Sequence, residues 1–146
     1  MKKILSLIFV IGISFLAQAQ GGDVNVGANV GLTTGSGNTS FVIGGDIEYL
    51  FDVESRFDVG AASGLIFVTD ANAIILPLAV AGRFQATNLI NLGLDMGYGI
   101  GLNKSGNGFY FRPIFSYALK KGIRLRASYT GIESSGYFNV GAMFDL

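Results

Sequence analysis

The residues of this chain that could do chemistry lie at alternate positions within apolar segments. Asp46 and Glu48 are carboxylates two positions apart, and paired carboxylates are common in general acid–base catalysis. Arg124 and Arg126 repeat this spacing with the opposite charge. Residues two apart project from the same face of a β-strand, so each pair shares one face. The charges placed inside such segments are Asp46, Glu48, Asp58, Arg83, Asp95, Arg112, Arg124, Arg126 and Asp145.

The composition argues against an enzyme. The 146 residues include no His and no Cys, so neither a Ser-His nor a Cys-His nucleophile pair can form, and a zinc site is not expected. The Gly-rich stretch GSGNTS at 35–40 lacks the Lys of a phosphate-binding loop and does not open a helical pattern. A formal net charge of zero gives no reason to expect a nucleic-acid partner. We therefore expect no catalytic residue, no metal and no cofactor.

The segments that carry the charges have the period of β-strands. Residues 90–102 read INLGLDMGYGIGL, with a large apolar residue at every even position and a small or polar residue at every odd one. Seven further segments alternate in the same way, and turn-rich stretches separate them. Their length suits strands that cross a bilayer at a tilt. The eight predicted strands are 23–33, 41–51, 57–69, 74–84, 90–102, 109–119, 123–131 and 137–146.

The two faces of these predicted strands differ sharply. The apolar faces contain no charged residue, and Ser63 is their only polar side chain. Their aromatic residues gather near both strand ends, as in the girdles of a membrane barrel. The opposite faces have too many glycines and too few charges for a surface in water, since only 14% of the chain is charged. We therefore predict that the apolar faces point into lipid, while small residues make room for Arg and Asp in a narrow lumen.

The first twenty residues predict export. Lys2 and Lys3 precede a short apolar stretch, and Ala17-Gln18-Ala19 gives a small-x-small cleavage pattern. The sequence thus divides into a signal peptide at 1–19 and one barrel domain at 20–146, with cleavage after Ala19. Without Cys, the exported chain has no disulfides to stabilise it.

The whole mature chain resembles the small eight-stranded outer-membrane barrels of the OmpA/OmpX type. The end of the chain also resembles the C-terminal signal that the barrel assembly machinery reads, at Asn139, Gly141, Phe144 and Leu146. The resemblance implies an all-β fold, an eight-stranded antiparallel up-and-down transmembrane barrel, in the outer membrane of a Gram-negative cell. It implies outer-membrane lipid and the assembly machinery as partners of a monomeric, non-enzymatic barrel with a structural or surface-interaction role.

Two details and two alternatives follow from the same pattern. We expect ion pairs between Asp58 and Arg83 and between Arg124 and Asp145, in a packed polar lumen. Pro77 and Pro113 lie inside predicted strands, so a bulge or a local break is expected near each.

Two alternatives to the membrane-spanning barrel with a packed lumen remain open. One is a soluble periplasmic lipocalin-like barrel that binds an apolar ligand, and the other is a narrow channel for small solutes.

Overall fold

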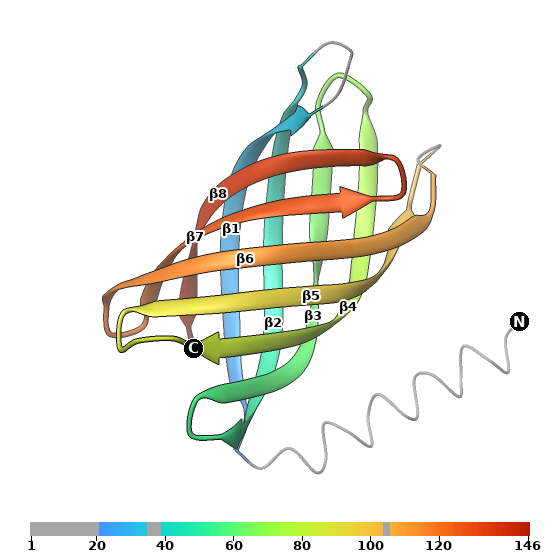
Figure 1. Cartoon of the computed structure of the whole chain (residues 1–146). Helices are drawn as coiled ribbons and strands as arrows, with labels where there is room; N and C mark the ends of the chain where they lie inside the picture. Colours follow the sequence, from blue (N-terminus) through green and yellow to red (C-terminus); the bar gives the residue numbers. More distant parts are fainter. Residues whose placement is uncertain (1–20, 35–38, 104–105) are drawn as a thin grey trace, which may run out of the picture.

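The protein is a closed barrel of eight antiparallel strands in chain order (Figure 1). The computed structural model describes residues 21–34, 39–103 and 106–146. Every strand pairs with its neighbours in sequence, and β1 pairs with β8 to close the barrel. This confirms the predicted all-β up-and-down architecture. The predicted signal peptide at 1–19 lies outside the described residues.

The strand boundaries follow the predicted segments closely. The largest differences are three residues at the end of β2 and two at the start of β8. No helix among the described residues is long and apolar enough to cross a membrane. The strands are β1 (Asp23–Thr34), β2 (Phe41–Glu54), β3 (Phe57–Val68), β4 (Ala73–Gln85), β5 (Ile90–Gly101), β6 (Gly108–Lys120), β7 (Ile123–Ile132) and β8 (Ser135–Asp145).

The barrel has two different ends (Figure 1). One end, which we call the terminus end, holds the start of β1, the end of β8 and the turns at 55–56, 86–89 and 121–122. The turn before β7 uses Gly122 at a φ of +81°, a conformation that favours glycine. The other end, the loop end, holds the ends of β1, β3, β5 and β7 and the starts of β2, β4, β6 and β8.

The two prolines interrupt the strand ladders without shifting their register. Between β3 and β4 the pairing skips Pro77, which still pairs with Gly99 of β5 on its other side. The Ser63 hydroxyl donates a 2.8 Å hydrogen bond to the Pro77 carbonyl beside this break. Pro113 likewise pairs with Leu94 of β5, while the ladder between β6 and β7 is interrupted next to it. The expected local breaks are therefore confirmed.

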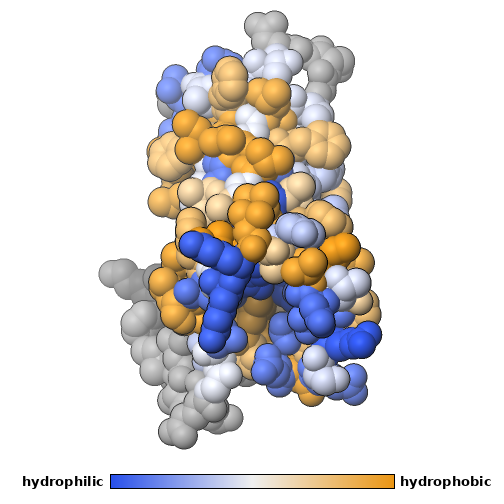
Figure 2. Space-filling view, turned by 90° about the vertical axis from the view of Figure 1, so that its left-hand side faces the viewer, coloured by the Kyte–Doolittle hydropathy of each residue, from blue (hydrophilic) through white to orange (hydrophobic). Residues whose placement is uncertain are grey.

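The apolar faces point outward. Large apolar side chains are exposed on every strand, and Val80 and Phe41 reach 70% and 66%. Figure 2 shows one side of this surface, where orange apolar residues cover much of the wall and blue hydrophilic residues gather toward the terminus end. Six of the nine charged residues predicted to face the lumen are buried in the middle of the barrel, and Asp58, Arg124 and Asp145 lie partly or fully exposed at the terminus end. The predicted assignment of the two faces is therefore confirmed.

Candidate functional site

Six of the predicted lumen charges meet in one network in the middle of the barrel. Arg83 Nη2 lies 2.5 Å from Glu48 Oε2, and Arg83 Nη1 lies 2.6 Å from Asp95 Oδ1. Arg112 continues from Asp95 Oδ2 at 2.8 Å to Asp46 Oδ1 at 2.7 Å. Since Asp46 and Glu48 are both on β2, these contacts close a ring through β4, β5 and β6. Arg126 of β7 joins the ring at Glu48 Oε1, at 2.9 Å.

The charges of this network balance. Three guanidinium groups face three carboxylates, and no member is more than 9% exposed. Buried charges are costly unless they are paired and hydrogen-bonded, and this ring pairs every one of its charges. We call these six residues, Asp46, Glu48, Arg83, Asp95, Arg112 and Arg126, the charged layer.

Amide and hydroxyl side chains extend the charged layer. Asn29 Nδ2 donates to Asp46 Oδ2 at 2.7 Å, and Asn139 Nδ2 donates to Asn29 Oδ1 at 3.0 Å. The Ser128 hydroxyl donates to Asn139 Oδ1, and Asn25 Nδ2 donates to Glu48 Oε1. Asn25, Asn29 and Ser128 were not among the residues predicted to act in the lumen. Their signal was present, since each occupies the non-apolar face of its predicted strand.

Glycines give the large lumen side chains their room. A Cβ at Gly93 would lie 2.9 Å from Arg83 Cδ and 3.1 Å from Arg83 Nη1. A Cβ at Gly27 would meet the Met143 sulfur in the same way. Arg83 and Met143 are each only 1% exposed. The lumen is therefore tightly filled at these levels, and the glycines opposite the long side chains are part of that packing.

The two predicted ion pairs have different outcomes. Arg124 Nη2 lies 2.5 Å from Asp145 Oδ1 at the terminus end, and this pair is partly exposed. Asp58 lies opposite Arg83 in the register of β3 and β4, yet the two form no ion pair. The expectation for Asp58 was wrong because the long Arg83 side chain extends inward to Glu48 and Asp95. Asp58 instead lies at the mouth of the barrel, opposite Asp52 of β2.

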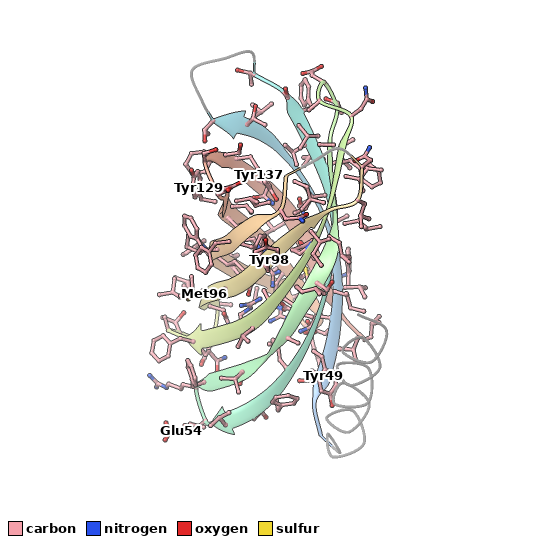
Figure 3. The ribbon with its side chains drawn as sticks, turned by 90° about the vertical axis from the view of Figure 1, so that its right-hand side faces the viewer. Tyr49, Glu54, Met96, Tyr98, Tyr129 and Tyr137 are labelled. Carbon is pink, nitrogen blue, oxygen red and sulfur yellow. The ribbon has the colours of Figure 1, made fainter. Side chains whose placement is uncertain are left out.

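The loop end of the lumen is apolar, which corrects the expectation of a polar interior throughout. Five buried residues from β2, β3, β6, β7 and β8 pack together there, and Ile75 of β4 is nearby. The Arg112 guanidinium lies 5.9 Å from the centre of the Tyr110 ring, where this apolar layer meets the charged layer. Figure 3 labels Tyr137 on this side of the barrel and Glu54 toward the opposite end. We call Val42, Ile66, Tyr110, Ile132 and Tyr137 the apolar layer.

The sequence pattern indicates this apolar layer, although the predicted polar lumen did not include it. Near the loop end, FVI at 41–43, LIF at 65–67 and FYF at 109–111 are large and apolar on both faces. Strict alternation ends in these triplets, as in strands that are buried on one face and exposed to an apolar phase on the other.

The terminus end opens into a cavity of about 510 Å³. Its wall includes Asp52 and Glu54 of β2, Asp58 of β3, Asn91 of β5 and Arg124 of β7. Within the part of the chain that the structure describes, no group of three or more His, Cys, Asp or Glu residues is placed to hold a metal ion. We call this cavity the vestibule.

The residues compared with an assembly signal have clear places in the folded barrel. Asn139 is buried in the lumen network, and a Cβ at Gly141 would lie 2.7 Å from the Asn29 Cβ. Phe144 and Leu146 are exposed, by 43% and 79%. Packing inside the barrel therefore accounts for the residue types at Asn139 and Gly141. Phe144 and Leu146 point outward and are free to contact another molecule.

These features define a transmembrane β-barrel fold, and comparison with known proteins agrees. No protein-family model matches the chain, and no curated protein matches its sequence. Among solved structures, it is similar to a de novo designed transmembrane β-barrel, with a TM-score of 0.67 and 11% identity over 87% of this chain and 98% of that one. It is also similar to Ail, the attachment invasion locus protein of Yersinia pestis, with a TM-score of 0.59 and 11% identity over 86% and 97%. Neisserial surface protein A matches with a TM-score of 0.55 and 12% identity over the same shares.

The fold is accordingly that of the small eight-stranded outer-membrane barrels, the OmpA/OmpX-like type that the sequence resembles. The identities are low, so these comparisons concern the fold.

Proposed function

We propose that the protein is a monomeric, non-enzymatic barrel that spans an outer membrane and has a structural role there. The observation that carries this proposal is the continuous apolar outer wall. Every strand exposes large apolar side chains, from Val30 on β1 to Val140 on β8. A soluble monomer rarely exposes an apolar patch larger than a few hundred Å². A closed barrel also pairs its strand edges internally, which the hydrocarbon of a bilayer demands.

The positions of the aromatic residues indicate how deeply the barrel sits in the membrane. Near the loop end, Phe111 and Tyr129 lie 6.1 Å apart between ring centres, and Tyr129 and Phe138 lie 4.9 Å apart. Near the terminus end, Tyr49 and Phe51 meet edge to face at 5.3 Å. Aromatic residues at both rims with aliphatic residues between them match the two interfaces of a bilayer. Short turns at the terminus end favour a periplasmic position for that end.

The lumen supports neither alternative. A lipocalin-like barrel would enclose its apolar ligand, whereas here the centre is occupied by the paired charges of the charged layer. A channel would need a water path through the barrel, and the charged layer and the apolar layer both fill the lumen with buried side chains. We therefore expect no large, steady porin-like conductance in planar bilayers.

The loop end favours a structural role over a role in binding sulfated sugars. Ail, one of the similar structures, has been solved with the heparin analogue sucrose octasulfate. Sulfate groups call for arginine or lysine. In this chain the connections at the loop end carry Asp70 and Glu133, and Lys104 is their one basic residue in the sequence. We expect no binding of sucrose octasulfate.

The decisive experiment is fractionation of a Gram-negative host that expresses the full chain. We expect the protein in the outer membrane, soluble only with detergent, with a gel mobility that changes on boiling as the barrel unfolds. A water-soluble protein that needs no detergent would contradict the proposal. Intact mass should also show Gln20, or its cyclised form, as the first residue, and a mature chain that retains Lys2 would contradict the proposed signal peptide.

The proposed assembly signal can be tested apart from packing. Phe144 is exposed, so Phe144→Ala removes little from the folded interior. We expect less barrel in the outer membrane of cells, with unchanged folding of the purified chain into detergent micelles. An equal loss of folded barrel in cells and in micelles would mean that Phe144 contributes to stability and not to recognition by the assembly machinery.

A further inference from the structure

Polar atoms without partners are concentrated in the charged layer and between that layer and the terminus end. Within the described residues, seven buried side-chain nitrogen and oxygen atoms have no hydrogen-bond partner. Six of them lie in the first four residues of their strands, counted from the terminus end. The seventh, Thr130 Oγ1, lies toward the loop end opposite Tyr137. The six atoms are Asn25 Oδ1, Arg83 Nε, Asn91 Oδ1, Arg124 Nε, Arg126 Nε and Arg126 Nη1.

A row of polar side chains joins these atoms to the vestibule. Asn91 and Arg124 line the vestibule directly. Ser116 of β6 is the register partner of Asn91 on one side and of Arg126 on the other. Arg126 is only 6% exposed and binds Glu48 through Nη2, which leaves its Nε and Nη1 hydrogens for another acceptor. Water is the usual partner of such buried polar atoms.

The loop end offers water fewer partners, since Thr130 Oγ1 is the one unpartnered buried atom on that side among the described residues. The apolar layer places Val42, Ile66 and Ile132 across the lumen, each 7% exposed or less. Gly99 lets the opposing side chains meet, since a Cβ there would lie 3.3 Å from Ile132 Cγ2 and 3.4 Å from Ile75 Cγ2. A narrow apolar constriction of this kind excludes water and ions by dewetting.

We propose that the lumen is a one-sided aqueous half-channel. Water and small hydrophilic solutes enter at the terminus end, pass the vestibule and follow the row of Asn91 and Ser116 as far as Arg126. The apolar layer blocks them from the loop end. The inference rests on the proposed membrane-spanning function, and it adds that the two sides of the membrane have unequal access to the interior.

The chain contains no cysteine, so a single introduced thiol can report this access. Ser116→Cys places a thiol in the polar row, and Val42→Cys places one in the apolar layer. The two positions are matched in burial, at 2% and 0% exposed. Lys121→Cys and Asp70→Cys are exposed references for the terminus end and the loop end. Each folded variant is placed in phospholipid vesicles, and a small, charged, membrane-impermeant methanethiosulfonate is added outside.

We expect the labelled fraction of Ser116→Cys to follow that of Lys121→Cys. Its rate should exceed that of Val42→Cys by about tenfold or more, because only a solvated thiol forms the reactive thiolate. An unreactive Ser116→Cys would overturn the half-channel, and so would labelling that follows Asp70→Cys. A reactive Val42→Cys would overturn the seal. Failure of the proposed function is distinct, since a chain that does not insert would neither float with the vesicles nor change its gel mobility on boiling.

Discussion

The charged layer and the apolar layer occupy the same narrow lumen, yet they are held together by different forces. The charged layer depends on specific ion pairs, such as that of Arg83 with Glu48 and Asp95. The apolar layer depends on packing of side chains such as Ile66 and Ile132, which need no particular partner. Losing one partner in the first leaves a charge uncompensated, whereas losing a methyl group in the second leaves a small void. The difference teaches that similar burial can carry very different sensitivity to mutation.

The largest effect is expected at the centre of the charged layer. Arg83→Ala leaves Glu48 with Arg126 alone and Asp95 with Arg112 alone, so we expect a loss of about 3–5 kcal/mol of unfolding free energy. Urea unfolding in lipid vesicles measures it. Arg83→Met is the control, since it keeps most of the volume and removes the charge. Equal losses in both variants would show that charge decides, and losses under about 1 kcal/mol in both would contradict a dominant role for the ion pairs.

A second prediction contrasts a charge in the lumen with a charge in lipid. Leu94 is 45% exposed at the middle of β5, and its neighbour Asp95 is fully buried on the opposite face. Leu94→Arg should cost about 2–4 kcal/mol, because a cation at mid-bilayer depth has no counter-charge. Leu102→Arg, at the loop end of the same segment, should cost about 0–1 kcal/mol. Refolding titrations in vesicles compare the two, and equal costs would mean that the outer wall does not face hydrocarbon.

The sequence predicted the strands and their outward faces because a period of two depends on local residue order alone. Cross-lumen contacts do not follow from that period. Glu48 meets Arg83 of β4 and Arg126 of β7, and neither strand is a neighbour of β2. Asp58 lies opposite Arg83 in the strand register. The arginine side chain is long enough to reach the lumen, however, and it pairs there with the buried carboxylates of Glu48 and Asp95.

A substitution in the apolar layer should lower the unfolding free energy less than Arg83→Ala or Leu94→Arg. Ile132→Val removes one methyl group from a residue that is 7% exposed, and we expect a loss of about 0.5–1.5 kcal/mol. Ile47→Val removes the same group from the outer wall, where Ile47 is 49% exposed. Lipid chains can fill that space, so its loss should be smaller. Urea unfolding of the two variants side by side provides the measurement, and a larger loss for Ile47→Val would place the tighter packing outside the lumen.

The smallest loss of unfolding free energy is expected at the mouth of the barrel, where an arginine–carboxylate ion pair is exposed to water. Arg124 and Asp145 form an ion pair at 2.5 Å, but their side chains are 19% and 43% exposed. Water can hydrate Asp145 after Arg124→Ala, so the loss should be about 0–1 kcal/mol, as for other exposed pairs. Raised salt should reduce it further, because ions screen exposed charges and not buried ones. Urea unfolding at low and high salt, beside Arg83→Ala, tests this directly. A loss as large as that of Arg83→Ala would mean that the terminus end is dry, and the aqueous half-channel would then have no entrance.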